Sequence, residues 1–457
     1  MYLKRIIDTN LNIKFKGIKL NSKDIKRGDI FIPFPNRYNH IDDIVDKCLI
    51  ITDKPYKHKN AIVVSNLETE IINIFDKYYN YPLRGINLIG VTGTDGKTTV
   101  SSILKDLLNS PTIGTNGFLI GKKTYPLANT TPSIDILYSC FNKVRNKKYK
   151  NLVMEVSSEA YLTKRIGNLN FSIAILTNIT RDHLDKHKSL DNYINSKLEL
   201  FKHSKIAILN KDSKYYNLFK ENSHISYSYG FNKESDLRIL EYKLLKNKSF
   251  IVFKYKNKIY KTYYPLLGKF NVLNIASSIL TMLVLGYSMK DIKNRLNKIK
   301  PVKGRMEIMS LKPFIVLDYA HTEKATYCVL NYFSRFNKDI ITILGAAGDR
   351  YKEKRKLVGE YALKYSKLVI FTMDDPRDED PCLIIKDMIN RDYSNYLIIL
   401  DRKEAIKYAI NNYQNDLILV LGKGRDNYML VNNQKIKYSD YKTIKKDLKR
   451  KKQKNKK

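Results

Sequence analysis

The sequence has no tryptophan and only four cysteines among 457 residues. Cys48, Cys140, Cys328 and Cys382 lack the close spacing of a metal site or a disulfide framework, which favours a reducing, cytoplasmic setting. No apolar run reaches the ~18–20 residues that span a bilayer, so we expect no membrane insertion. The first residues also lack the pattern of a secretory signal. A hydrophobic fraction of 43% excludes a disordered or collagen-like chain.

Acidic residues are scarce as well. The chain has 45 Asp and Glu against 83 Lys and Arg, a formal net charge of +38, and an excess of this size is typical of proteins that bind polyanions. Lysine outnumbers arginine more than threefold, however, and Asn, Ile and Tyr are abundant, as AT-rich codon bias would produce. Residues 445–457 form the only basic block, and we expect the tail 441–457 to be disordered. Charge alone does not decide between these interpretations. A nucleic-acid-binding P-loop ATPase is a further alternative, but the sequence has no helicase-like or aromatic-rich recognition block, and we expect no nucleic-acid partner.

Strand-like and helix-like segments alternate along most of the chain. Continuous apolar runs, such as 173–176 and 417–421, are typical of buried parallel strands. The pattern predicts an α/β protein with a central P-loop ATPase-like parallel sheet and a C-terminal Rossmann-like, doubly wound sheet. An antiparallel hairpin insert is predicted around residues 223–264. We expect domains at 1–84, 85–300 and 301–440.

A glycine-rich loop at residues 90–99 (GVTGTDGKTT) follows an apolar run and precedes a helix-like stretch. In such a loop the backbone N–H groups surround phosphate oxygens, Lys97 adds a positive charge, and the Thr98 hydroxyl can ligate Mg²⁺. The strict phosphate-loop spacing requires glycine at Val91, whereas this variant has Gly93 and Gly96. Its context favours ATP or GTP binding over an ordinary glycine turn.

Two further polar residues follow neighbouring apolar runs. Glu155 and His183 are expected at the carboxyl ends of adjacent strands, where open α/β sheets bind ligands. A carboxylate and an imidazole there could hold a second cation. Taken alone, the segment Asp182–Asp185 is more often a helix cap than a metal site.

The loop at residues 93–99 resembles the ATP loop of the Mur ligase family, which joins amino acids to cell-wall precursors. Blocks 268–274, 301–307 and 318–322 follow in the family's order. The resemblance implies an ATP-dependent, Mg²⁺-requiring amide ligase that acts through an acyl phosphate. It implies an ATP site of Gly93, Thr94, Asp95, Gly96, Lys97, Thr98, Thr99, Asn271, Asn274, Arg305 and Asp318. It also implies magnesium ligands Thr98, Glu155 and His183, and catalytic Lys97, His183 and Lys197, the last carbamylated as N6-carboxylysine.

Within the family the resemblance is closest to the MurE type, which adds the third peptide residue to UDP-N-acetylmuramoyl-L-Ala-D-Glu. It implies that the UDP-muramoyl dipeptide is bound by Ser22, Thr130, Thr131, Ser157, Thr163 and Arg165. Thr163 stands where the family has glutamine, and Glu159 where it has histidine. The segment Asn21–Lys23 also departs from the usual Asp-Ser-Arg. A Mur-like ligase for another carboxylate, such as a folate or polyamino acid, is therefore the alternative.

The resemblance also implies that the incoming amino acid is bound by Arg350, Asp374, Asp375, Arg377, Gly422 and Asp426. Arg377 suits the distal carboxylate of meso-diaminopimelate by bidentate pairing. Residues 374–377 (DDPR) resemble the Asp-Asn-Pro-Arg motif that accompanies diaminopimelate in the family. Asp375 replaces the asparagine of that motif and would instead attract the ammonium of L-lysine. The two signals conflict, and we favour diaminopimelate slightly. A monomer is expected.

Overall fold

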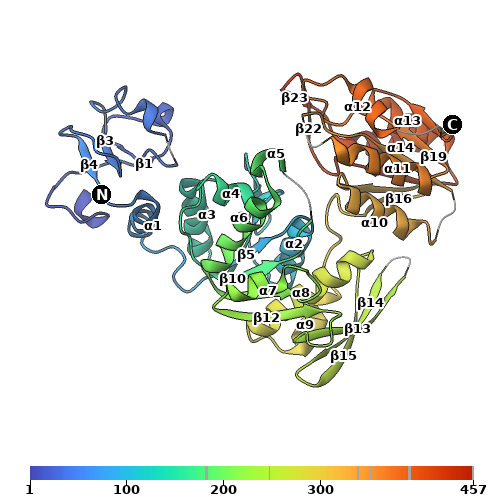
Figure 1. The fold of residues 1–457 in the computed structure, drawn as a ribbon, viewed down its shortest axis with the longest axis horizontal. Helices are drawn as coiled ribbons and strands as arrows, with labels where there is room; N and C mark the ends of the chain where they lie inside the picture. The colour runs from blue at the N-terminus through green and yellow to red at the C-terminus, as the bar shows by residue number, and fades with distance from the viewer. Residues whose placement is uncertain are drawn as a thin grey trace. The chain divides into compact units, whose positions relative to one another are not determined.

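The computed structural model describes residues 1–35, 37–180, 184–245, 248–336, 339–349, 352–389 and 393–454. The chain forms two compact units. Figure 1 shows their helices and strands, coloured along the chain. The first comprises residues 1–179, 189–236 and 277–287. The second comprises residues 180–188, 237–276 and 288–457. The α/β class predicted from the alternating segments is confirmed.

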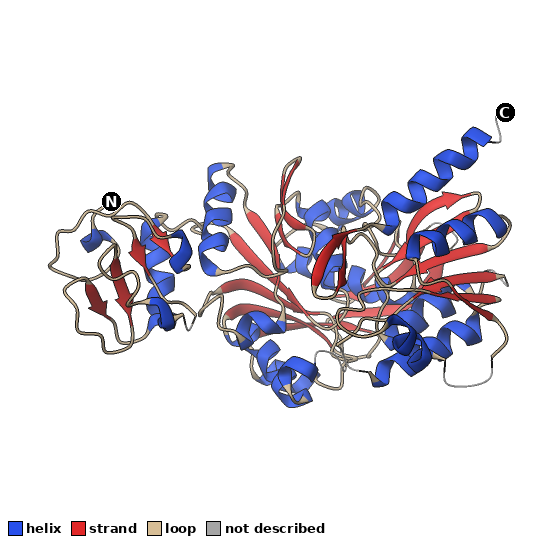
Figure 2. Cartoon of the chain, turned by 90° about the horizontal axis from the view of Figure 1, so that it is seen from above, coloured by secondary structure: helices blue, strands red, loops and turns tan. Residues whose placement is uncertain are grey.

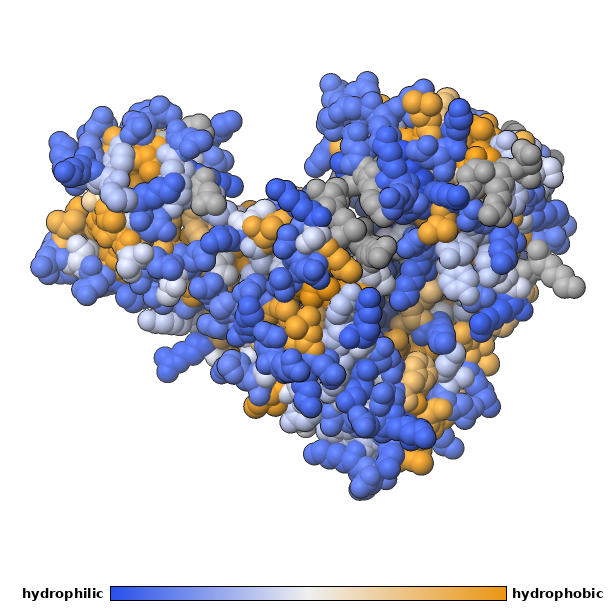
Figure 3. All heavy atoms as spheres, viewed as in Figure 1, coloured by the Kyte–Doolittle hydropathy of each residue, from blue (hydrophilic) through white to orange (hydrophobic). Residues whose placement is uncertain are grey.

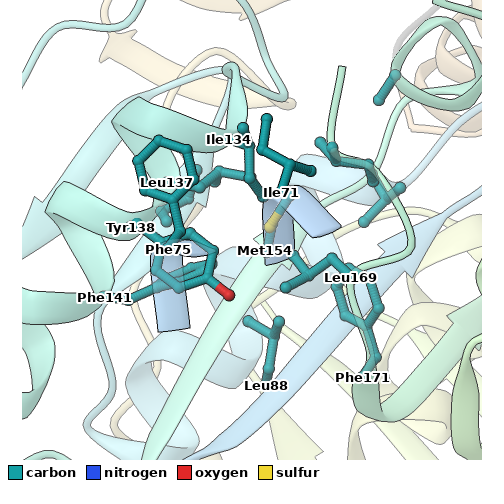
Figure 4. Close-up of a cluster of buried hydrophobic side chains, with 14 of the residues drawn as sticks. Ile71, Phe75, Leu88, Ile134, Leu137, Tyr138, Phe141, Met154, Leu169 and Phe171 are labelled. Atoms are coloured by element: carbon teal, nitrogen blue, oxygen red, sulfur yellow. The ribbon is translucent and has the colours of Figure 1, made fainter. Parts of the chain in front are cut away.

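The N-terminal part of the first unit has a sheet of its own. Four short parallel strands lie in chain order, namely β1 (Ile18–Lys19), β2 (Ile30–Phe31), β3 (Leu49–Thr52) and β4 (Ala61–Val63). Helix α1 (Leu67–Tyr78) follows, capped by the Asn66 side chain, which accepts from the Thr69 N–H. Its buried face, with Ile71 and Phe75, packs against helix α3 (Ile134–Asn146), as Figure 4 shows. One continuous core therefore joins the N-terminal sheet to the central one.

The central sheet of the first unit has the order β12-β11-β10-β5-β9-β6-β7-β8. Its strands are β5 (Asn87–Thr92), β6 (Thr112–Gly114), β7 (Gly117–Ile120), β8 (Lys123–Tyr125), β9 (Asn151–Glu155), β10 (Phe171–Leu176), β11 (Ser204–Asn210) and β12 (Ile225–Gly230). The strands from β12 to β6 are parallel, and β7 and β8 are antiparallel additions. The helices are α2 (Lys97–Leu108), α3, α4 (Ser158–Leu162), α6 (Leu190–Lys202) and α7 (Tyr216–Glu221). The predicted parallel sheet is thus present.

The antiparallel insert lies in the second unit. Strands β13 (Leu237–Leu244), β14 (Ser249–Tyr255) and β15 (Lys258–Tyr264) form an antiparallel meander. The predicted insert began too early, because β12 pairs parallel with β11. Helix α5 (Leu184–His187) also belongs to the second unit, and α8 (Lys269–Val284) begins there and ends in the first.

The C-terminal sheet of the second unit has the order β16-β17-β21-β18-β19-β20. Its strands are β16 (Glu307–Leu311), β17 (Phe314–Asp318), β18 (Ile340–Leu344), β19 (Leu368–Phe371), β20 (Tyr396–Ile398) and β21 (Leu417–Leu421). Only β16 is antiparallel. Alternate residues of each strand face opposite sides; Val316 packs with α10 and α11, whereas Ile315 packs with α13 and α14. The helices are α9 (Met289–Leu296), α10 (Glu323–Phe333), α11 (Glu353–Tyr365), α12 (Pro381–Met388), α13 (Arg402–Asn412) and α14 (Asp440–Lys454).

The C-terminal segment differs from the predicted disordered tail. Residues 440–454 form helix α14, which leads to the C-terminus (Figure 2). Ile444 is fully buried, and Tyr441 and Leu448 pack beside it against the core that α13 also covers. This spacing gives one apolar stripe on an otherwise basic helix, which suffices to order it. A hairpin of β22 (Tyr428–Val431) and β23 (Gln434–Lys437) precedes it.

The face of the molecule seen in Figure 3 is largely hydrophilic, with apolar residues in small groups. In the part of the chain that the structure describes, no helix has the length and apolar character needed to cross a membrane.

Candidate active site

The glycine-rich loop joins β5 to helix α2, as the sequence predicts. Gly96 has a left-handed backbone (φ +88°) and is the N-cap of α2, so the backbone N–H groups of the first turn of α2 line the loop. Lys97 lies at the first position of that helix. Its Nζ donates to the carbonyls of Gly93 at 2.8 Å and Thr94 at 2.9 Å, which holds the ammonium over the loop. This is the geometry of a site for phosphate oxygens.

The residues after β10 fix the shape of this loop. The Asn178 carbonyl accepts from the Thr94 N–H at 2.9 Å, and its side-chain oxygen accepts from the Asp95 N–H at 3.0 Å. Thr177 Oγ1 donates to the Asp95 carbonyl at 2.6 Å. A Cβ at Gly93 would lie 1.9 Å from Thr177 Oγ1, so only glycine fits there.

Glu155 and Thr98 converge beside the loop. Glu155 is buried at the end of β9, and its Oε2 accepts from Thr98 Oγ1 at 2.8 Å. Thr115 adds its N–H to Oε1 and its hydroxyl to Oε2, both at 3.1 Å. Burial raises the pKa of this carboxyl, and Thr98, Lys97 and Thr115 oppose that shift. A buried carboxylate beside a hydroxyl is a donor set that fits Mg²⁺. His183, the third predicted ligand, lies outside the described residues.

Lys197 lies on helix α6 and reaches the same loop. Its side chain is buried, and Nζ donates to the Gly93 carbonyl at 3.1 Å. The Tyr193 ring lies below the ammonium, with 4.5 Å from Nζ to the ring centroid. Tyr193 OH and Thr94 Oγ1 form a 2.9 Å hydrogen bond. Helix α6 thus places its one buried lysine against the phosphate loop.

The residues predicted to bind the dipeptide form one cluster in the first unit. Thr131 Oγ1 accepts from the Ser157 N–H at 2.9 Å. Arg165 donates from Nη1 to the Thr131 carbonyl at 3.1 Å and from Nε to Thr163 Oγ1 at 3.0 Å. Thr163, which replaces the family's glutamine, therefore orients the arginine. Thr130 Oγ1 reaches Thr115 at 3.3 Å, which links this cluster to the Glu155 site.

Ser22, the remaining predicted UDP contact, begins a short 3₁₀ turn in the N-terminal part. Beside it is a hollow of about 430 Å³, lined by residues of the N-terminal block and of the central sheet region. Asn21, Asp24 and Tyr78 line one part of it. Tyr125 and Lys143 line another, with Lys143 Nζ 4.3 Å from the Tyr125 ring centroid.

In the second unit, Asp318 ends β17 and holds the turn at Arg305 and Met306, which precedes β16. Asp318 accepts from the Met306 N–H at 2.6 Å through Oδ2 and from the Ala320 N–H at 2.7 Å through Oδ1. The Arg305 guanidinium lies 4.5 Å from the Tyr319 ring centroid. Burial raises the Asp318 pKa, and Arg305 opposes the shift. This aspartate therefore holds the turn in place; its predicted contact with ATP stays a prediction.

Asn271 and Asn274 lie one turn apart in α8, and both side chains are buried. Asn271 Nδ2 donates to the Leu267 carbonyl at 2.6 Å, and Asn274 Nδ2 donates to Asn271 Oδ1 at 2.9 Å. These hydrogen bonds fix the orientation of both amide side chains.

The residues predicted to bind the amino acid gather after β19 and β21. Lys423 is buried, and its Nζ lies 2.7 Å from Asp375 Oδ1 and 3.4 Å from Asp374 Oδ1. Asp375 Oδ1 also accepts from the Leu430 N–H at 2.9 Å. Burial raises the pKa of Asp426, and Lys423 opposes that shift.

Arg377 is placed differently from its acidic neighbours. It has a left-handed backbone (φ +55°), and its Nε is buried without a hydrogen-bond partner among the described residues. A Cβ at Gly422 would lie 2.4 Å from Asp374 Oδ2, so the glycine allows that carboxylate to approach. Arg350 lies outside the described residues.

Known proteins resemble this chain over nearly its whole length. A diaminopimelate-adding ligase (UDP-N-acetylmuramoyl-L-alanyl-D-glutamate–2,6-diaminopimelate ligase) of Fusobacterium nucleatum is 34% identical, with 98% of this chain and 97% of that protein covered. One of the same name from Clostridium acetobutylicum is 33% identical, covering 96% and 98%. The chain belongs to the Mur ligase family.

The family's domains also match separately. The Mur ligase middle domain matches residues 91–282, and the Mur ligase glutamate ligase domain matches residues 304–424. A solved structure of a diaminopimelate-adding ligase shares the fold of this Mur ligase, with a TM-score of 0.72 at 24% identity and 99% coverage of both chains. As a Mur ligase, the protein is an ATP-dependent acid–amino-acid ligase.

Several residues that shape the site of this Mur ligase were absent from the sequence-based prediction. Thr115 holds Glu155, Asn178 holds the phosphate loop, and Lys423 neutralises Asp375. Of these three residues, only Lys423 could have been selected from its sequence neighbours, because it lies between two glycines directly after an apolar strand. Thr115 and Asn178 reach their partners through pairings between distant strands, which the sequence does not display.

Proposed function

We propose that this Mur ligase adds meso-diaminopimelate to UDP-N-acetylmuramoyl-L-Ala-D-Glu in peptidoglycan synthesis. The observation that carries the proposal is full-length similarity, above 30% identity, to ligases that carry this name. ATP would pass its γ-phosphoryl group to the terminal carboxylate of the dipeptide and give an acyl phosphate. The amino group of diaminopimelate would then attack the acyl carbon, and inorganic phosphate would leave.

The charge pattern of the amino-acid pocket supports diaminopimelate over L-lysine. The Asp375 carboxylate, which could have attracted a lysine ammonium, already pairs with buried Lys423 at 2.7 Å. Arg377 Nε is buried without a hydrogen-bond partner among the described residues, and we propose that the distal carboxylate pairs with this guanidinium. Diaminopimelate has that second carboxylate and L-lysine does not. We propose that Asp426 receives the amine of the substrate.

Residues in the first unit supply the phosphoryl-transfer chemistry. Lys97 places a positive charge where charge gathers on the transferring group, and the N–H groups of α2 stabilise the same oxygens. We propose that Thr98 and Glu155 hold Mg²⁺, which would neutralise phosphate charge when bound. We also propose that carbamylated Lys197 supports this cation from α6.

The dipeptide end of the donor would lie at Arg165, whose guanidinium is aimed by Thr131 and Thr163. The uridine end would find aromatic and amide side chains in the hollow beside Ser22, where stacking and hydrogen bonding are both available. These assignments would make the first unit the donor site.

A competition experiment tests the proposed reaction. The purified protein is incubated with ATP, Mg²⁺, UDP-N-acetylmuramoyl-L-Ala-D-Glu and equal concentrations of meso-diaminopimelate and L-lysine, and the product is read by mass spectrometry. We expect the diaminopimelate tripeptide as the main product. A lysine tripeptide would reverse the assignment of Arg377 and Asp375. If no product formed but another carboxylic acid raised the melting temperature, the alternative acceptor would be correct.

A further inference from the structure

An internal ion pair lies behind the turn that carries Arg377. Arg355 on α11 is 1% exposed, and its two terminal nitrogens each donate to one oxygen of Glu379 at 2.9 Å. This bidentate geometry is the strongest form of a carboxylate–guanidinium contact. Nothing in the proposed chemistry uses either residue directly.

The pair also holds the neighbouring turn, which follows β18. Arg355 Nη2 donates to the Ala347 carbonyl at 3.1 Å, and Glu379 Oε1 accepts from the Asp349 N–H at 2.5 Å. The Gly348 N–H in turn donates to the Asp375 carbonyl at 2.9 Å. The two turns are therefore joined side by side, and Glu379 contacts both.

The contact between the turns is close. A Cβ at Gly348 would lie 1.9 Å from the Pro376 carbonyl oxygen. On its other side, the Arg377 turn is bonded to the β22–β23 hairpin, because Arg377 N–H donates to the Leu430 carbonyl at 3.1 Å. Arg377 has φ of +55°, which persists for a residue with a Cβ only when its surroundings enforce it.

We propose that Glu379 and Arg355 are positioning residues that hold the Arg377 turn in place for the distal carboxylate of the amino-acid substrate. The inference rests on the proposed function. Loosening the pair frees the turn after β18, which then no longer supports the backbone of Arg377. Because Arg377 acts in substrate binding, the loss appears in the KM for the amino acid rather than in the phosphoryl-transfer step.

Asp387 provides a matched control. It is the other acidic partner of Arg355, at 2.8 Å from Nη1, but it lies on α12, and the described hydrogen bonds link it to neither turn. Glu379→Gln and Asp387→Asn each remove one negative charge from the same arginine. A merely structural role of the ion pair predicts a loss of stability without a selective rise in the KM for diaminopimelate.

The experiment compares steady-state kinetics of the full-length variants with those of the wild type. For Glu379→Gln we expect the KM for diaminopimelate to rise about tenfold or more, with the KM for ATP unchanged and kcat within about threefold. For Asp387→Asn we expect a KM for diaminopimelate within about twofold of the wild type. Arg355→Lys keeps the positive charge but cannot donate to both oxygens of Glu379. We expect it to raise the KM for diaminopimelate as much as Glu379→Gln does, and it replaces that variant if Glu379→Gln does not fold.

An unchanged KM for diaminopimelate in Glu379→Gln, or equal changes in both acidic variants, would overturn the positioning role. That outcome is separate from failure of the proposed function, which wild-type product analysis detects. If the wild type ligates L-lysine, which has no distal carboxylate, the positioning role is overturned together with the assignment of Arg377.

Discussion

Lys97 is the residue with the most direct role in the proposed chemistry. Its ammonium is held over the phosphate loop by two carbonyls of that loop. We expect Lys97→Ala to lower kcat for ligation by about 10²–10³-fold or more, because a prearranged charge is lost from the transferring phosphoryl group. Product formation over time gives the rate.

Lys105 serves as the control, since it lies on the same helix and pairs with Asp106 at 2.7 Å. Lys105→Ala should keep wild-type activity. Substantial ligation by Lys97→Ala would contradict the assignment of the loop.

Glu379 predicts a pH effect on stability. Hydrogen bonding from Arg355 lowers the pKa of this carboxyl from 4.5 to about 2. Because the pKa is lower in the folded state, the carboxylate stabilises the fold above pH 4.5, and this contribution is lost as pH falls toward 2. We expect the wild type to melt at a higher temperature than Glu379→Gln at pH 7.

Below pH 4.5 the two melting curves should approach each other. Thermal unfolding at several pH values measures the difference. A difference in melting temperature between the two proteins that stays constant down to pH 3 would show that the ion pair does not lower the pKa of Glu379.

At the scale of single elements, helix α14 anchors the C-terminal sheet through Asp440. Asp440 and Arg402 are both fully buried, and the guanidinium donates through Nε and Nη2 at 2.9 Å each. Removing one partner leaves a buried charge unpaired, so Asp440→Asn should lower the free energy of unfolding by about 3–5 kcal/mol. Urea denaturation measures the change.

Asp447 on the same helix provides the comparison. Asp447 Oδ1 lies 3.8 Å from Arg450 Nη1, which is too long for a hydrogen bond; the Asp447 side chain is 11% exposed, but that of Arg450 is 60% exposed. Asp447→Asn should therefore change the stability by less than about 0.5–1 kcal/mol. Equal effects of the two substitutions would mean that the buried pair does not anchor the helix.

The elements differ in how far the sequence reveals them. Strands such as β21 were predictable because their apolar runs are continuous, and the phosphate loop because its glycines and Lys97 are contiguous. The pairing of β12 was not predictable, since its alternating polar and apolar residues are compatible with a hairpin strand or with a strand added parallel to a sheet. In the structure β12 pairs parallel with β11. Helix α14 was missed because Tyr441, Ile444 and Leu448 are separated by lysines.

The same division applies to the candidate site. Residues within contiguous motifs, such as Thr98 and Arg377, could be selected by their neighbours in sequence. Contacts between distant segments could not be predicted. Thr115 is hydrogen-bonded to Glu155, 40 residues away in sequence, and Arg355 to Glu379, 24 residues away. Such positioning residues have no pattern of their own, because the fold alone brings them to the site.

At the scale of the whole molecule, the net charge of +38 is the remaining feature to interpret. The cations with a proposed role, among them Lys97, Arg165 and Arg377, are proposed to bind small anionic substrates. Helix α14 adds a basic face with exposed Lys445, Lys446 and Lys449. If codon bias produced the excess, this face is one of many similar surfaces and has no special affinity for polyanions.

We therefore expect duplex DNA to bind weakly at low salt, to dissociate as salt rises, and to leave ATP hydrolysis unchanged. In the test variant, three exposed lysines of α14 (445, 446 and 449) are replaced by glutamine. In the control variant, three exposed lysines of the first unit (122, 123 and 150) are replaced by glutamine. These substitutions keep α14 intact, whereas deleting residues 445–457 would remove part of a folded helix. Diffuse charge predicts that both triple variants lose DNA affinity by factors that agree within about twofold, because each removes the same number of cations from phosphate contacts. DNA-stimulated ATP hydrolysis that disappeared only in the α14 variant would instead make that helix a nucleic-acid site.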